Sequence, residues 1–69
     1  MIDIKNNLHK PIKECEPDAN NEMTYLEFIM YGYAYINCPL SANRILEIVQ
    51  MDNQQLNDII DELDWLMDK

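Results

Sequence analysis

Apolar residues near the end of the chain recur at steps of three and four, which is the spacing of one helical face. The opposite face of the same segment is acidic, and no basic residue lies between Asp52 and Asp68. This pattern predicts an amphipathic helix after Asp52 that buries one stripe and exposes carboxylates on the other side. The residues of the apolar stripe are Leu56, Ile59, Ile60, Leu63, Leu66 and Met67.

Capping signals predict a first helix over residues 24–36, where Thr24 and Glu27 match a capping box. After Glu27 this segment carries no charge on any face, and such a helix is either buried or serves two interfaces. A chain of 69 residues has little else to cover it, so the pattern favours a homodimer over a central core helix. The predicted dimer-interface residues are Tyr25, Phe28, Ile29, Tyr33 and Tyr35.

A second helix is predicted over residues 42–50, because Ser41 is a favourable cap and Pro39 ends the segment before it. Asp52, followed three residues later by Gln55, forms a second capping-box pattern for the last helix. The residues of the second helix expected to face inward are Ile45, Leu46, Ile48 and Val49. Trp65 is expected at the boundary of the core.

Residues 1–22 are expected to form an irregular arm, since Pro11 and Pro17 break any long helix there. Three of the five basic residues fall in this arm, so it either folds against an acidic body or stays a solvated tail. The sequence thus divides into the arm and a three-helix domain over residues 23–69. The fold class predicted is all-α.

Charge is distributed very unevenly. Residues 14–68 hold 12 of the 13 acidic residues but only one of the five basic residues, Arg44. A surface of this kind repels nucleic-acid phosphates and anionic membranes, and it favours basic partners. The acidic residues expected to contact a partner are Asp58, Asp61, Glu62, Asp64 and Asp68.

The two last helices, with the short turn around Met51, resemble a helix-turn-helix. The positions buried in that family are matched by apolar residues, namely Ile45, Val49, Met51, Leu56 and Ile59. Residues 24–67 are similar to the three-helix core of winged-helix regulators without the wing. The resemblance implies a DNA-reading alternative, a dimer with Asn53, Gln54 and Asn57 facing bases and Arg44 facing a phosphate.

No motif for catalysis, phosphate binding or zinc binding is present, so no enzyme activity, cofactor or metal site is predicted. Cys15 and Cys38 are not in a Cys-x-x-Cys pair, and we expect free thiols, although spacing alone does not exclude a disulfide. The N-terminus lacks the order of a signal peptide and no run is long enough to span a bilayer, which predicts a cytoplasmic protein.

These features favour a small regulatory or inhibitory protein. Its acidic helix is expected to occupy a basic surface on a partner protein that handles nucleic acid, because rows of carboxylates can stand in for phosphates. Small acidic proteins of phage and mobile elements, such as inhibitors of host enzymes, are similar in size and charge. The alternative is the dimeric DNA-binding regulator.

Overall fold

A computed structural model of the chain describes residues 2–68, and these residues form helices and turns without a β-strand. The prediction of an all-α fold is therefore confirmed. Three helices make up the body: α2 (Tyr25–Tyr35), α3 (Ala42–Gln50) and α4 (Asn53–Met67). The N-terminal segment contains the short helix α1 (Ile12–Cys15) between two 3-10 turns, η1 (Lys5–Asn7) and η2 (Pro17–Ala19).

The starts of the three longer helices lie where the capping signals predicted them. The Thr24 hydroxyl accepts from the backbone N–H of Glu27 at 3.1 Å, and the Glu27 carboxylate accepts from the N–H of Thr24 at 3.0 Å. Asp52 and Gln55 form the same reciprocal pair at the start of α4, and Ser41 caps α3. Each cap satisfies N–H groups that a helix leaves without a partner.

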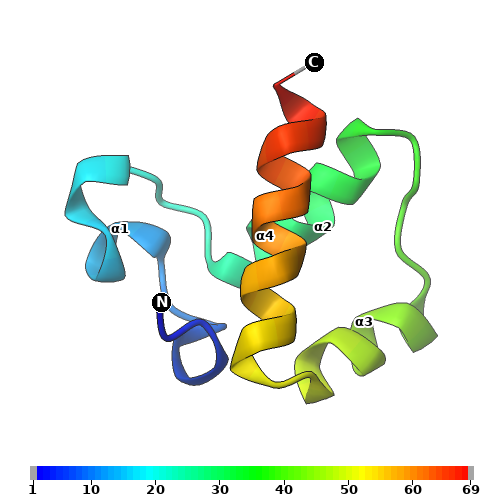
Figure 1. The fold of residues 1–69 in the computed structure, drawn as a ribbon, viewed down its shortest axis with the longest axis horizontal. Coiled ribbons are helices and arrows are strands. Elements are labelled where there is room, and N and C mark those ends of the chain that lie inside the picture. Colours follow the sequence, from blue (N-terminus) through cyan, green and yellow to red (C-terminus); the bar gives the residue numbers. More distant parts are fainter. Residues whose placement is uncertain (1, 69) are drawn as a thin grey trace.

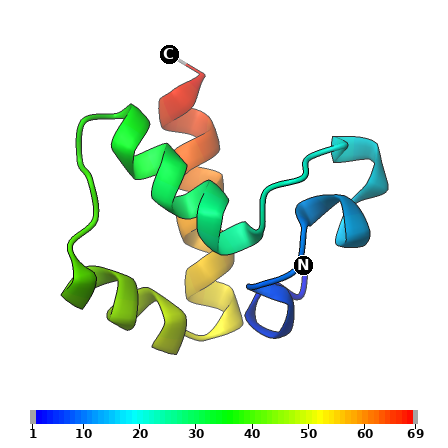
Figure 2. The same cartoon turned by 180° about the vertical axis from the view of Figure 1, so that it is seen from behind.

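Helix α4 runs through the middle of the molecule and α2 crosses against it (Figures 1 and 2). Gly32 lies at this crossing, where a Cβ atom would come within 3.0 Å of the Leu63 side chain and 3.3 Å of Met67 Sδ. The missing side chain lets the two helices approach closely. Tyr25 and Ile29 lie on the same buried side of α2, at 1% and 0% exposure.

The core draws on all parts of the chain. The N-terminal segment contributes one third of the buried apolar residues, although the sequence predicted only an arm there. The buried residues are Ile4, Leu8, Ile12, Tyr25, Ile29, Ile48, Leu56, Ile59 and Leu63. Residues 2–22 thus adopt the first of the two expected arrangements, in which the segment folds against the helices.

The side-chain amide of Asn53 holds the start of the chain against α4. Its Oδ1 atom accepts from the backbone N–H groups of Ile4 at 2.7 Å and Lys5 at 3.0 Å, and its Nδ2 atom donates to the carbonyl of Ile2 at 2.9 Å. Asn57, one turn later, donates to the same carbonyl at 2.9 Å. Two residues expected as DNA readers therefore anchor the N-terminal segment.

Two large apolar side chains lie further out than predicted. Leu46 was expected to face inward but is 57% exposed, because α3 contacts the body along a narrow stripe centred on Ile48. Trp65, expected at the boundary of the core, is 60% exposed. Both side chains belong to the outer surface of the bundle.

Replacing Asn53 by alanine removes three hydrogen bonds to the backbone of the N-terminal segment. Because Ile4 is buried, loss of the acceptor for its N–H should cost about 1–3 kcal/mol of unfolding free energy. Urea unfolding followed by circular dichroism measures this loss. The matched variant Gln54→Ala, at an exposed position of the same turn, should change stability by less than about 0.5 kcal/mol. Equal stabilities of the two variants would contradict the anchoring role.

Candidate functional site

Helix α4 presents two rows of carboxylates to solvent. Asp61, Asp64 and Asp68 follow one another at steps of three and four and so share a stripe, while Asp58 and Glu62 form a second stripe. All five residues are exposed, and within residues 2–68 none of them forms an ion pair. The predicted partner-binding residues are therefore accessible, and their charge is not neutralised by any described base.

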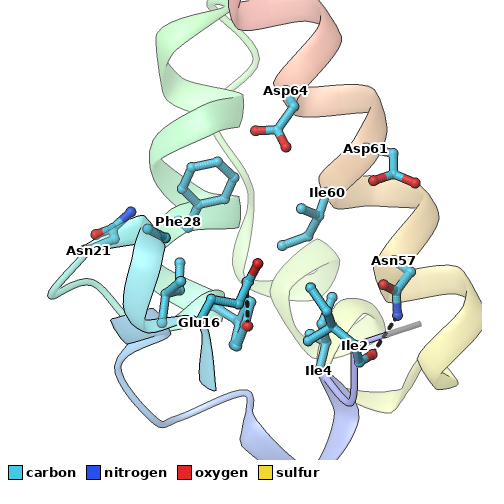
Figure 3. A pocket seen from close by; sticks show the side chains of 12 residues that line it. Ile2, Ile4, Glu16, Asn21, Phe28, Asn57, Ile60, Asp61 and Asp64 are labelled. Carbon is cyan, nitrogen blue, oxygen red and sulfur yellow. Dashed lines mark hydrogen bonds between the residues drawn. The ribbon is translucent and has the colours of Figure 1, made fainter. Parts of the chain in front are cut away.

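A groove of about 280 Å³ opens beside the first of these stripes (Figure 3). It lies between the N-terminal segment, the first two turns of α2, and α4. Ile12, Phe28 and Ile60 supply apolar surface from these three parts of the chain. Figure 3 shows Phe28 and Ile60 facing each other from α2 and α4. The groove exists only because the N-terminal segment folds onto the helices.

The rim of the groove is acidic. Glu16 lies on the side of the N-terminal segment, while Asp61 and Asp64 lie on the side of α4, and the side chain of Asp64 points toward the groove in Figure 3. Glu16 Oε2 accepts a hydrogen bond of 2.7 Å from the Tyr25 hydroxyl. None of the described residues that line the groove is basic. The groove thus combines apolar walls with uncompensated negative charge.

The ionisation of the groove residues reflects this arrangement. Partial burial raises the pKa of Asp64 above its ordinary value, and the nearby charges of Asp61, Asp68 and Glu16 raise it further. Burial, together with the hydrogen bond to Glu16 and its negative charge, raises the pKa of the Tyr25 hydroxyl well above its ordinary value. Tyr25 therefore stays protonated as a donor, and the field of Glu16 reaches Asp64 on the other side of the groove.

The residues of the DNA-reading alternative do not form a free reading surface. The amides of Asn53 and Asn57 are bonded to the N-terminal backbone, and their reading of bases stays a prediction. Gln54 Nε2 donates to Asp58 at 2.9 Å, and Arg44 pairs with Glu47 at 2.8 Å. A base edge or a phosphate would have to displace these contacts.

Part of the predicted dimer interface is buried inside the chain. Tyr25 and Ile29 are buried within the chain itself, against α4 and the N-terminal segment, so a second subunit cannot contact them in this fold. Phe28 lines the groove, and Tyr33 is half-buried. Of the five residues, Tyr35 alone is largely exposed, at 60%.

Sequence reasoning missed the part of the site contributed by the N-terminal segment. The residues predicted to bind a partner all lie on the last helix and do not include Glu16. The four-residue spacing of Ile4, Leu8 and Ile12 was the available signal that this segment has a buried side. Without it, Asp61 and Asp64 could be placed on an open helix face but not beside a groove.

Comparison with protein-family models, with curated proteins and with solved structures gives no match. In residues 2–68 no helix is both long and apolar enough to cross a membrane. No group of three or more His, Cys, Asp or Glu residues in that range is arranged to hold a metal ion, and Cys15 and Cys38 are free thiols.

Asp64 should make stability depend on pH. Because its pKa in the folded chain lies above the ordinary value of 3.8, the folded chain binds more protons than the unfolded chain between these values. The unfavourable contribution of Asp64 is therefore absent at low pH and complete once the pH exceeds the raised pKa. Asp64→Asn should raise the unfolding free energy at neutral pH, and this gain should vanish near about pH 3.

Urea unfolding of wild type and variant at the two pH values measures this difference. Glu62→Gln removes the same charge from α4 at an exposed position that does not line the groove, and it should not reproduce the full gain. A loss of stability for Asp64→Asn at neutral pH would contradict the conclusion that the Asp64 carboxylate is unfavourable in the folded chain.

Proposed function

We propose that the chain is a small regulatory or inhibitory protein that binds a basic surface of another protein through the acidic side of α4. The observation that carries this proposal is the set of four exposed carboxylates on the 15-residue helix α4 together with Asp68 directly after it, none of them in an ion pair within residues 2–68. A rigid row of negative charge matches a surface built for phosphates, so a nucleic-acid-handling protein is the proposed partner.

The position of the charges along α4 supports a role in binding. Asp64 and Asp68 lie at the C-terminal end of the helix, where the macrodipole is negative and carboxylates are unfavourable. The last turn carries no basic residue to offset them. Residues that destabilise the local structure in which they lie are expected mainly at functional sites. A basic partner would convert this unfavourable cluster into a favourable contact.

The same surface disfavours the DNA-reading alternative. We propose a helix-turn-helix-like arrangement for α3 and α4, which are joined through Met51 and Asp52, but as a scaffold rather than as a DNA reader. Sequence-specific binding needs phosphate contacts that fix the register on the duplex. Two basic residues lie near the proposed reading helix, and both are engaged within the chain: Arg44 pairs with Glu47, and the Lys5 ammonium donates to the carbonyl of Val49 at 2.9 Å. We therefore expect no mobility shift with duplex DNA even at low salt.

Reversal of two charges on α4 tests the proposal. Asp61→Lys/Asp64→Lys should abolish affinity capture of the partner from lysate of the cells that make this protein, because the variant repels a basic surface. The matched control Glu14→Lys/Glu47→Lys changes net charge equally at exposed positions away from α4 and should retain capture. Circular dichroism should show equal helix content in all three proteins.

Captured proteins are identified by mass spectrometry, and raising the salt concentration should release the true partner. If the α4 variant captured the same protein as wild type, the acidic face would not be the binding surface. A specific shift of duplex DNA by the purified wild type would instead favour the alternative.

A homodimer stays a proposal with a smaller interface than the sequence suggested. The exposed apolar residues of α2 are Met30, Tyr31 and Tyr35, and the two tyrosine rings contact each other with centroids 6.1 Å apart. Aromatic side chains bury about 150–250 Å² each, which leaves this surface below the roughly 800 Å² per partner of a standard interface. Any self-association through it is therefore weak.

Sedimentation equilibrium should show a monomer at low protein concentration and a reversible dimer only at high concentration. Tyr35→Ser should remove the dimer without unfolding the chain, because Tyr35 is 60% exposed. Asn43→Ser, at an exposed position of α3, serves as the control. A tight dimer that survives Tyr35→Ser would place the interface elsewhere.

A further inference from the structure

We propose that the groove beside α4 receives a single arginine side chain from the basic protein partner. This inference rests on the proposed function and names the chemistry of the group that the partner presents. The groove lies between Glu16 and Ile12 of the N-terminal segment, Phe28 of α2, and Ile60, Asp61 and Asp64 of α4 (Figure 3).

The size of the groove favours one side chain over a larger ligand. Its volume of about 280 Å³ lies just below the range of roughly 300–1,000 Å³ that is typical of pockets for drug-sized molecules. Its walls are apolar where Ile12, Phe28 and Ile60 face inward. A long side chain with an aliphatic stem can cover such walls while its charged head stays at the rim.

The charges at the rim favour a cation. Glu16 lines the groove from the N-terminal segment and Asp64 lines it from α4, so carboxylates lie on two of its sides. No basic residue lines the groove within residues 2–68. Partial burial raises the pKa of Asp64, and repulsion from the charges of Asp61, Asp68 and Glu16 raises it further. A bound cation would relieve this repulsion.

The geometry favours arginine over lysine. A guanidinium has five N–H donors in a planar fork, which can bond carboxylates on two sides, whereas an ammonium acts as a compact point charge that is more strongly hydrated. The planar group also stacks on aromatic rings, and Phe28 lines the groove. The spacing of Phe28, Tyr31 and Tyr35 continues this aromatic stripe along α2. Arginine is also among the residues that contribute most to protein interfaces.

Nuclear magnetic resonance of the full, ¹⁵N-labelled chain tests the inference with N-acetylarginine amide as the probe. We expect saturable shifts at the amides of Glu16, Phe28 and Asp64, which line the groove. N-acetyllysine amide should bind more weakly at the same residues. N-acetylcitrulline amide, which has nearly the shape of the arginine probe without its charge, should cause no saturable shift.

Two charge-neutralising variants separate the groove from the rest of α4. Asp64→Asn should weaken binding of the arginine probe roughly tenfold, since it removes a charge-assisted hydrogen bond. Glu62→Gln removes the same charge from the other stripe of the same helix and should leave the affinity within about twofold of wild type. Both positions are exposed, so both variants are expected to fold.

Three results would overturn the inference. The first is the absence of saturable shifts at the groove residues, and the second is equal binding of the citrulline probe. The third is an equal effect of Asp64→Asn and Glu62→Gln, which would mean that the probe senses only the general charge of α4. Shifts at the groove that depend on protein concentration without any probe would identify a second copy of the chain as the occupant.

The inference and the proposed function fail in different ways. If the captured partner still binds wild type but not Asp61→Lys/Asp64→Lys, while the arginine probe leaves the groove unchanged, the acidic face is functional and the arginine site is wrong. If the probe binds the groove while capture of the partner is insensitive to the charge reversal, the groove is an arginine site and the proposed function is wrong.

Discussion

The hydrogen bonds of the Asn53 side-chain amide are the contacts on which the rest of the structure depends. The amide bonds the backbone of Ile2, Ile4 and Lys5, residues that lie 48 to 51 positions earlier in the chain. This contact brings the start of the chain to α4, so that Ile4 can enter the core. It satisfies backbone groups that burial would otherwise leave without a partner. The groove follows from it, because the N-terminal segment forms one of the walls.

The acidic side of α4 is compatible with this fold because the opposite side of the helix is well buried. Leu56 and Leu63 are 0% and 1% exposed, and Gly32 allows α2 to approach Leu63 closely. The stability of the helix therefore comes from packing rather than from its charges. The side chains of Asp61 and Asp64 are therefore not needed to stabilise the helix, and they are available for binding. The cost of Asp64 to stability comes from partial burial and from repulsion by nearby carboxylates, which a cation in the groove would offset.

Local structure could be predicted from the sequence, whereas long-range contacts could not. The caps at Thr24 and Asp52 depend on residues three positions apart, and the structure has them as predicted. The role of Asn53 depends on hydrogen-bond partners far away in the chain, and the periodicity of apolar residues does not predict such partners. Tyr25 was assigned to a dimer because an apolar helix must be covered, but the N-terminal segment and α4 cover it within one chain. The acidic stripe was visible in the sequence, while the groove beside it required the fold.

Native-state hydrogen exchange at the amides of Ile4 and Ile12 tests the central claim most directly. The Ile4 N–H is bonded to Asn53, and the Ile12 N–H donates to the carbonyl of Met23 at 2.8 Å. If the N-terminal segment is part of the folded body, both amides should exchange only through global unfolding, at the same opening free energy as the amide of Leu63 in α4. Exchange of Ile4 and Ile12 at rates close to those of an unfolded chain, while Leu63 stays protected, would contradict the account.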